Sequence, residues 1–157
     1  MAEIKTNAMR MLDKAGVSYT LHTYPSDGGI DGLSIAAKMG QPVERVYKTL
    51  VTKGKNTYFV FVIPVAEELD LKAAARAVGE KAVEMIAVKD INKVTGYIRG
   101  GCSPVGMKKQ FQTVLDLSAK ELDTFYVSGG RIGLQMQIQP QALCEFIGAQ
   151  FAEITLG

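Results

Sequence analysis

Residues that could bind or transform a substrate gather in two glycine-rich stretches. Residues 95–106 read TGYIRGGCSPVG, and residues 127–133 read VSGGRIG. Glycine has no Cβ, so its backbone can approach a ligand closely, and this mixture of glycine, proline and serine cannot continue a helix or strand. Either stretch alone could be a tight connection between strands. Because both also carry a serine and an arginine, together they indicate a shared site.

Lys48 is the notable charged residue outside these stretches. In a strand over residues 46–52 it shares a face with Val46 and Leu50, where a charge is costly unless it meets an anion or lines a cleft. The alternative is an edge lysine that prevents aggregation. Between residues 89 and 109, five basic side chains face one acid. This excess suits either a phosphate-bearing partner or a solvated surface.

The sequence offers little of the machinery of a hydrolase. His22 is the only histidine, and a lone histidine in a predicted strand is more often a packing or surface residue. Cys102 could be a nucleophile if it met His22, but no acid follows in a recognisable triad order. Neither glycine stretch contains Asp, Glu or His. We therefore expect a site that binds and orients a substrate which supplies its own reactivity.

The composition is that of an ordinary soluble globular protein. The chain has 157 residues, 47% of them hydrophobic and 22% charged, and a net charge of +2, which suits one domain over residues 1–157. Cys102 and Cys144 lack a CxxC spacing, which argues against a zinc module and favours reduced thiols in a cytoplasmic protein. No apolar run approaches the ~18 residues that span a bilayer, and no signal peptide is evident.

Helical and strand patterns are interleaved along the chain. Amphipathic runs with caps predict helices over residues 7–15, 34–39, 71–78, 88–94 and 140–147. The first of these is expected to face inward with Ala8, Met11, Leu12 and Ala15. Alternating or β-branched runs predict strands over residues 17–24, 46–52, 57–63, 83–87, 114–116, 124–127, 132–138 and 151–156. Residues 26–32 are expected to form a flexible loop. Tight turns force antiparallel pairing, so the predicted fold class is α+β with a curved mixed β-sheet and flanking helices.

At these motifs the sequence resembles the YbaK family of aminoacyl-tRNA deacylases, which is related to the editing domain of bacterial prolyl-tRNA synthetases. The resemblance covers essentially the whole chain. It rests on HTY at 22–24, VYKTL at 46–50, LDLK at 69–72, VEM at 83–85, TGY at 95–97, GGCSP at 100–104, YVSGG at 126–130 and GL at 133–134. The glycine-containing blocks, in this order, look like the branch of the family that acts on cysteinyl-tRNA(Pro).

The resemblance implies a curved mixed β-barrel with flanking helices, and no metal or cofactor. It implies trans-editing: cysteine wrongly attached to tRNA(Pro) is removed when the substrate thiol attacks its own ester. Two positions match catalytic residues, Lys48 and Gly101. Others match substrate-binding positions: Tyr24, Thr49, Gly100, Ser103, Ser128 and Gly129. The implied partner is the aminoacylated end of tRNA, with prolyl-tRNA synthetase as a second candidate.

Three features depart from the family pattern. Cys102 stands where an aliphatic residue is common, which favours a packing role for it. Gln135 stands where relatives often carry an acid, and residues 26–32 differ from the longer, acidic loops of relatives. Substrate discrimination could therefore differ. The alternatives are a deacylase for another mischarged tRNA, alanyl or seryl, and a non-catalytic module that binds aminoacyl-tRNA or a synthetase.

Overall fold

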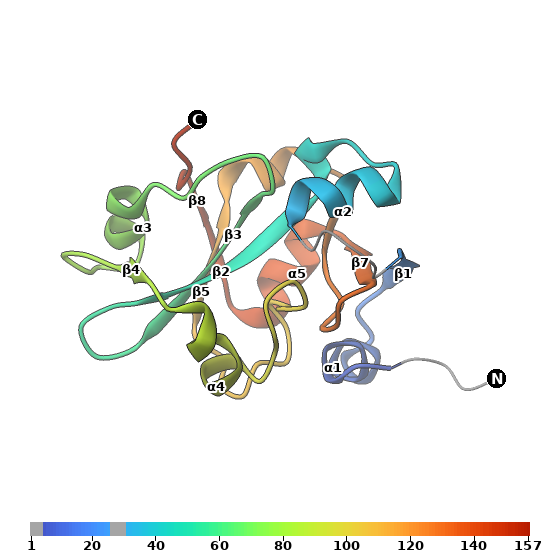
Figure 1. Cartoon of the computed structure of the whole chain (residues 1–157), viewed down its shortest axis with the longest axis horizontal. Helices are drawn as coiled ribbons and strands as arrows, with labels where there is room; N and C mark the ends of the chain where they lie inside the picture. Colours follow the sequence, from blue (N-terminus) through green and yellow to red (C-terminus); the bar gives the residue numbers. More distant parts are fainter. Residues whose placement is uncertain (1–4, 26–30) are drawn as a thin grey trace.

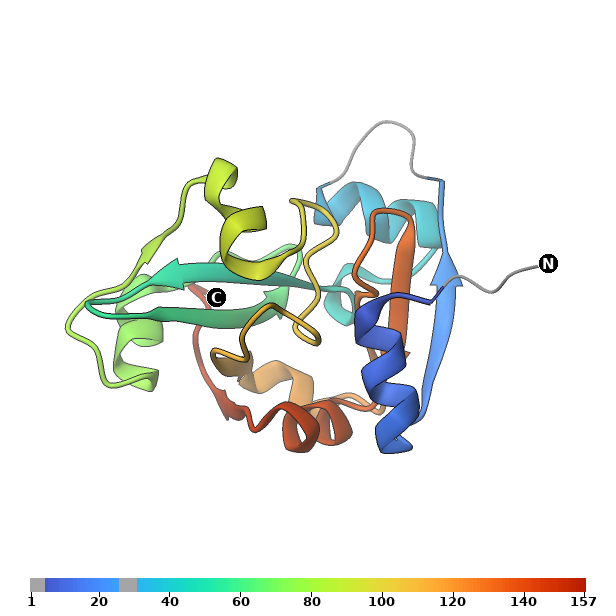
Figure 2. The same ribbon diagram turned by 90° about the horizontal axis from the view of Figure 1, so that it is seen from below.

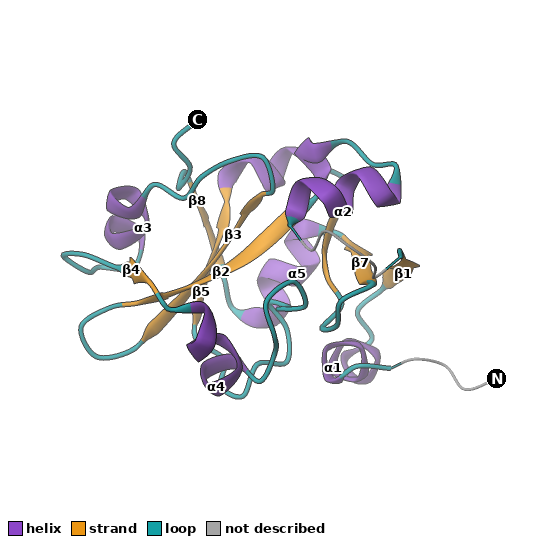
Figure 3. Ribbon diagram, in the orientation of Figure 1, coloured by secondary structure: helices purple, strands orange, loops and turns teal. Residues whose placement is uncertain are grey.

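The chain forms two β-sheets with helices packed around them, as a computed structural model describing residues 5–25 and 31–157 shows (Figures 1 and 3). The predicted α+β class is confirmed. The predicted loop over residues 26–32 lies mostly outside the described residues. Its last two positions begin a helix instead: Asp31 is the N-cap of α2 (Gly32–Met39) and accepts a hydrogen bond from the Ser34 N–H.

The larger sheet is built on the hairpin that the sequence predicts. β2 (Tyr47–Lys53) and β3 (Tyr58–Pro64) pair antiparallel, while β5 (Gln112–Asp116) and β8 (Gln150–Ala152) extend the sheet in parallel. With β4 (Glu84–Met85) beside β2, the strand order is β4-β2-β3-β5-β8. Nearly all of β3 is buried, as its almost continuous apolar run predicts for a strand covered on both faces.

The smaller sheet brings the N-terminal strand to the C-terminal part of the chain. β1 (Tyr19–Thr23) pairs with β7 (Leu134–Ile138), which also pairs with β6 (Phe125–Ser128), all antiparallel. A single parallel bridge between Val46 and Tyr126 connects this sheet to the larger one. Within the described residues the strands therefore form two open sheets rather than a closed barrel.

The helices begin and end at the signals in the sequence. Thr6 caps α1 (Asn7–Ala15), and Gly16 ends it with a φ of 73°, a conformation that suits glycine. The predicted inward face is partly wrong, because Met9 is buried and Met11 is 39% exposed. The other helical elements are α3 (Leu71–Ala77), α4 (Ile91–Thr95), α5 (Pro140–Ile147) and the 3-10 turns Val43–Arg45, Val88–Asp90 and Leu117–Glu121.

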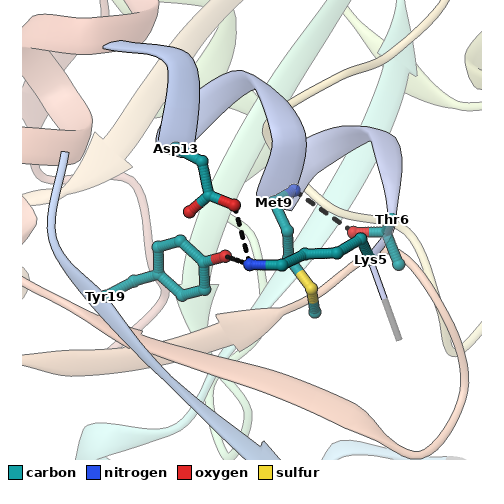
Figure 4. A network of polar contacts seen from close by, with 5 residues as sticks. All are labelled: Lys5, Thr6, Met9, Asp13 and Tyr19. Atoms are coloured by element: carbon teal, nitrogen blue, oxygen red, sulfur yellow. Dashed lines mark hydrogen bonds and ion pairs between the residues drawn. The ribbon is translucent and has the colours of Figure 1, made fainter. Parts of the chain in front are cut away.

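Polar contacts fasten α1 to the small sheet (Figure 4). The Lys5 ammonium lies 2.7 Å from the Asp13 carboxylate and donates more weakly to the Tyr19 hydroxyl of β1 at 3.4 Å. The Thr6 hydroxyl accepts the Met9 N–H at 3.3 Å and donates to the Gly129 carbonyl. The start of α1 is thereby connected to the second glycine-rich stretch.

The first glycine-rich stretch is fixed by its own apolar side chains. Tyr97, Cys102 and Met107 join one hydrophobic cluster with Val51 of β2 and Val60 of β3. Figure 2 shows this segment, after α4, passing beside the hairpin toward the small sheet. A separate cluster packs α3 against the larger sheet. The glycine stretch is thus a packed part of the domain, which gives its turns defined positions.

Candidate active site

A cavity of about 280 Å³ opens where the two sheets meet. Its walls come from the start of α2, from β2, from the first glycine stretch and from the ends of β6 and β7. Four of the predicted site residues line it: Lys48, Thr49, Gly100 and Ser128. The structure thus brings together residues that are far apart in the sequence, as the resemblance implied.

Lys48 reaches this cavity from β2. It is partly buried, and no hydrogen bond or ion pair joins its ammonium to another residue in the described part of the chain. Burial lowers the pKa of the Lys48 ammonium, while the charges of Glu68 and Glu67 oppose that shift. A partly desolvated ammonium is stabilised most by a ligand that supplies a hydrogen-bond acceptor. Lys48 is therefore suited to an anionic group or an ester oxygen.

The first glycine stretch contains a tight turn over residues 98–101. The Gly101 N–H donates to the Ile98 carbonyl at 2.9 Å, and Gly100 has a φ of 86°. A positive φ at the third position is the mark of a type II turn, which explains a glycine there. The second position is Arg99, and both Arg99 and Gly100 line the cavity.

The two glycine stretches touch each other at Gly101. A Cβ added there would lie 3.0 Å from the Ile132 nitrogen and 3.1 Å from backbone atoms of Arg131. Gly101 does not line the cavity described above. In this structure its missing side chain permits the contact between the two stretches, and the catalytic role expected for Gly101 stays a prediction.

Three other predicted binding residues are not among the residues that line the cavity. Ser103 is fully buried, and its hydroxyl accepts the Val105 N–H at 3.2 Å. The Gly129 carbonyl accepts the Thr6 hydroxyl at 2.5 Å. Tyr24 is 7% exposed, and its buried hydroxyl has no hydrogen-bond partner among the described residues. The substrate contacts expected of these three residues remain predictions.

Gln135 lines the cavity and was not among the predicted site residues. It is 3% exposed, and its Oε1 has no partner within the described residues; the same holds for the Thr49 hydroxyl. Two positions further along β7, the Gln137 side chain forms hydrogen bonds with His22 and Thr124, at 2.9 Å each. Unpartnered buried polar atoms are rare and need an explanation. Around a cavity, they favour a ligand with polar groups.

The arrangement does not favour a Cys–His hydrolase. Burial raises the pKa of the Cys102 thiol to about 11, so almost none of it is thiolate at neutral pH. The His22 ring is engaged elsewhere: it bonds Gln137 and meets the Tyr126 ring edge-on at 5.3 Å. Cys102 lines the cavity as a small apolar residue, which agrees with the packing role inferred from the sequence.

Neither a metal-binding cluster nor a membrane-spanning helix is present among the described residues. Among residues 5–25 and 31–157, no group of three or more His, Cys, Asp or Glu side chains could hold a metal ion. In the same ranges, no helix has both the length and the apolar character needed to cross a bilayer.

Solved structures share this fold over nearly its whole length. A crystal structure of a protein described as hypothetical has a TM-score of 0.87 at 22% identity, covering 96% of this chain and 99% of that one. The crystal structure of a provisionally assigned trans-editing enzyme for prolyl-tRNA synthetase has a TM-score of 0.84 at 24% identity, covering 99% and 100%. At these identities the likeness establishes the fold.

Sequence comparisons establish the family. EbsC of Enterococcus faecalis, a provisionally assigned Cys-tRNA(Pro)/Cys-tRNA(Cys) deacylase, is 46% identical over 153 residues, which cover 96% of this chain and 93% of that protein. The proline–tRNA ligase of Fervidobacterium nodosum is 30% identical over 95 residues, covering 60% of this chain and 16% of the ligase. The model of the aminoacyl-tRNA editing domain matches residues 33–146, a range that holds every lining residue of the cavity except Asp31 and Gly32. The chain therefore belongs to the aminoacyl-tRNA editing domain family.

Proposed function

We propose that this protein is a trans-editing deacylase that removes cysteine wrongly attached to tRNA(Pro). One observation carries the proposal: among the residues that the structure describes, the polar lining of the cavity consists of two cations, hydroxyls, a glutamine and backbone groups, and its one carboxylate is already hydrogen-bonded. That carboxylate belongs to Asp31, which accepts hydrogen bonds from the Ser34 N–H and hydroxyl. These bonds hold the pKa of Asp31 below its usual value. Such a lining favours a substrate that brings its own nucleophile.

A cysteinyl ester carries such a nucleophile. Its thiol sulfur attacks the carbonyl carbon of its own ester, so that a carbon–sulfur bond forms and the bond to the ribose oxygen breaks. The thiol proton ends on that ribose oxygen, and the products are tRNA and a cyclic thiolactone. In this proposal the Lys48 ammonium donates a hydrogen bond to the carbonyl oxygen as negative charge develops on it, a role supported by its position in the cavity lining. The Gly100 backbone and Ser128 would hold the acyl group in the reactive geometry.

The size of the cavity supports a small acyl group as its occupant. At about 280 Å³ it lies just below the range for ligand pockets, which is roughly 300–1,000 Å³. An amino acid side chain fits such a space, whereas the polynucleotide has to stay outside it. This division agrees with the 46% identity to EbsC, whose assigned substrates are cysteinyl-tRNAs.

A deacylation assay with several charged tRNAs tests the proposal. We expect turnover of cysteinyl-tRNA(Pro) with release of a thiolactone, and no turnover once the substrate sulfur is methylated. Comparable hydrolysis of alanyl- or seryl-tRNA without thiolactone would favour the deacylase for another mischarged tRNA. Tight binding with no turnover of any of them would favour a non-catalytic module.

The same assay, with prolyl-tRNA synthetase added, tests the expected partner. Similarity to a segment of proline–tRNA ligase supports prolyl-tRNA synthetase as a candidate partner. Adding that synthetase should increase the preference for tRNA(Pro) over tRNA(Cys), and an unchanged preference would count against a functional complex. A substrate of this kind would place the protein in the cytoplasm.

A further inference from the structure

Arg99 is held at the rim of the cavity by the turn described above. Its backbone is fixed by the hydrogen bond from Gly101 to Ile98 and by the φ of 86° at Gly100. Arg99 is exposed, is one of the residues that line the cavity, and has no side-chain hydrogen bond or ion pair with any residue in the described ranges. The turn therefore presents a free guanidinium on a rigid support.

Within the described ranges, no carboxylate pairs with Arg99. The one carboxylate that these ranges contribute to the cavity lining, Asp31, accepts hydrogen bonds from Ser34 at the start of α2 with both of its oxygens. The segment before and after the turn adds Lys93 and Lys108, which are both exposed. The Lys108 ammonium donates to the Lys93 carbonyl, so its charge is kept beside α4. In the described part of the chain, the cavity lining itself carries two cations, Lys48 and Arg99, against the one carboxylate of Asp31, and this balance suits an anion.

Arg99 and Lys48 differ in ways that separate their tasks. Lys48 is partly buried within the strand-lined part of the cavity, whereas Arg99 is exposed at its edge. A guanidinium presents a planar fork of donors that matches phosphate bidentately, while an ammonium acts as a point charge. A cavity of this size takes the acyl group and leaves the nearest phosphate outside. The exposed Arg99 guanidinium is the group that such a phosphate would contact.

We propose that Arg99 binds the phosphate on the 5′ side of the nucleoside that carries the amino acid. This inference rests on the proposed function, and it adds a residue that selects a nucleotide-borne ester over a bare one. Arg99 acts here as a binding residue, because the reacting atoms lie deeper, beside Lys48. The substrate class that it defines is an aminoacyl nucleotide with a phosphate.

Two small substrates that differ by one phosphate test the proposal: 3′-O-cysteinyl-adenosine and its 5′-monophosphate. For Arg99→Gln we expect kcat/KM on the phosphorylated ester to fall by about 10- to 100-fold, the range for losing a charge-assisted contact. On the unphosphorylated ester the variant should equal the wild type. Arg76→Gln is the matched control, because Arg76 is an exposed arginine of α3 that does not line the cavity.

A binding measurement separates this proposal from the proposed function. The affinity of uncharged tRNA(Pro) is measured at several salt concentrations for both variants and the wild type. Losing one phosphate contact on single-stranded RNA should flatten the slope of log K against log salt by about 0.7 for Arg99→Gln and not for Arg76→Gln. That result would support the phosphate contact even if the wild type cleaved neither ester. Equal losses on both esters, or an unchanged salt slope, would overturn it.

Discussion

Replacing Lys48 with methionine should separate activity from stability. Methionine keeps a long unbranched side chain and removes the charge. If the ammonium donates a charge-assisted hydrogen bond to the ester in the transition state, its loss costs about 1.5–3 kcal/mol. At about 1.36 kcal/mol per tenfold change in rate, kcat/KM on cysteinyl-tRNA(Pro) should fall by about 10- to 150-fold.

The stability of the same variant should hold or rise. Burial lowers the pKa of Lys48 in the folded protein, so the unfolded chain binds the proton more tightly. The charged lysine therefore opposes folding at neutral pH, and this cost disappears as the pH rises through the interval between the folded pKa and the ordinary value of 10.5. Lys48→Met should thus match or exceed the wild type in free energy of unfolding at pH 7. Its advantage should shrink toward pH 11.

Urea denaturation at both pH values and single-turnover deacylation measure the two effects. Lys53→Met is the matched control, because Lys53 ends the same strand and is exposed; it should leave activity and stability close to wild type. Full activity of Lys48→Met would remove Lys48 from the site. Parallel losses of activity and stability would show that the lysine supports the fold, and would refute the reasoning.

Three more substitutions examine other parts of the site. Cys102→Ala should keep its activity, and the Cys102 thiol should resist iodoacetamide at pH 7.5 until the protein unfolds, because its pKa is about 11; inactivation by a covalent adduct in the folded state would contradict this. Gly101→Ala should lower both the melting temperature and kcat/KM, because the new Cβ meets the backbone of residues 131–132 at 3.0–3.1 Å and such overpacking costs about 1–3 kcal/mol; a normal melting temperature with lost activity would instead favour direct obstruction of the substrate. Thr6→Ala should cost about 1–2 kcal/mol in urea denaturation, since it removes both the cap of α1 and the bond to Gly129, whereas Thr6→Ser should restore most of it.

Much of the fold could be predicted because its signals are local. The ends of α1 follow from a capping threonine and a left-handed glycine, and the hairpin of β2 and β3 follows from two β-branched runs around a short turn. The inward face of α1 was less predictable, since Met9 and Met11 are equally apolar. Tertiary packing decides which of the two methionines is buried, because Met9 packs close to Gly129, which lies far along the chain.

The same limit applies to the candidate site: its local features could be predicted from the sequence, and its long-range contacts could not. The position of Lys48 on an otherwise apolar strand face could be deduced from alternation alone. The closeness of the two glycine stretches could be suspected, but the contact of Gly101 with the other stretch depends on how the sheets meet. Gln135 and Gln137 look alike in the sequence. Only the structure shows that His22 and Thr124 bond Gln137, whereas the side-chain oxygen of Gln135 has no partner among the residues described.

The pairing of β1 with β7 has a consequence for synthesis on the ribosome. β1 (Tyr19–Thr23) is synthesised well before its neighbour in the small sheet, which is residues 134–138. Pairings between such distant segments form slowly, because a long loop has to close first. Ser128 and Gln135 also belong to this late sheet, whereas Lys48 lies in the early hairpin. A nascent chain can therefore expose Lys48 long before the opposite wall of the cavity exists, and editing capacity should appear only after residues 134–138 have left the exit tunnel.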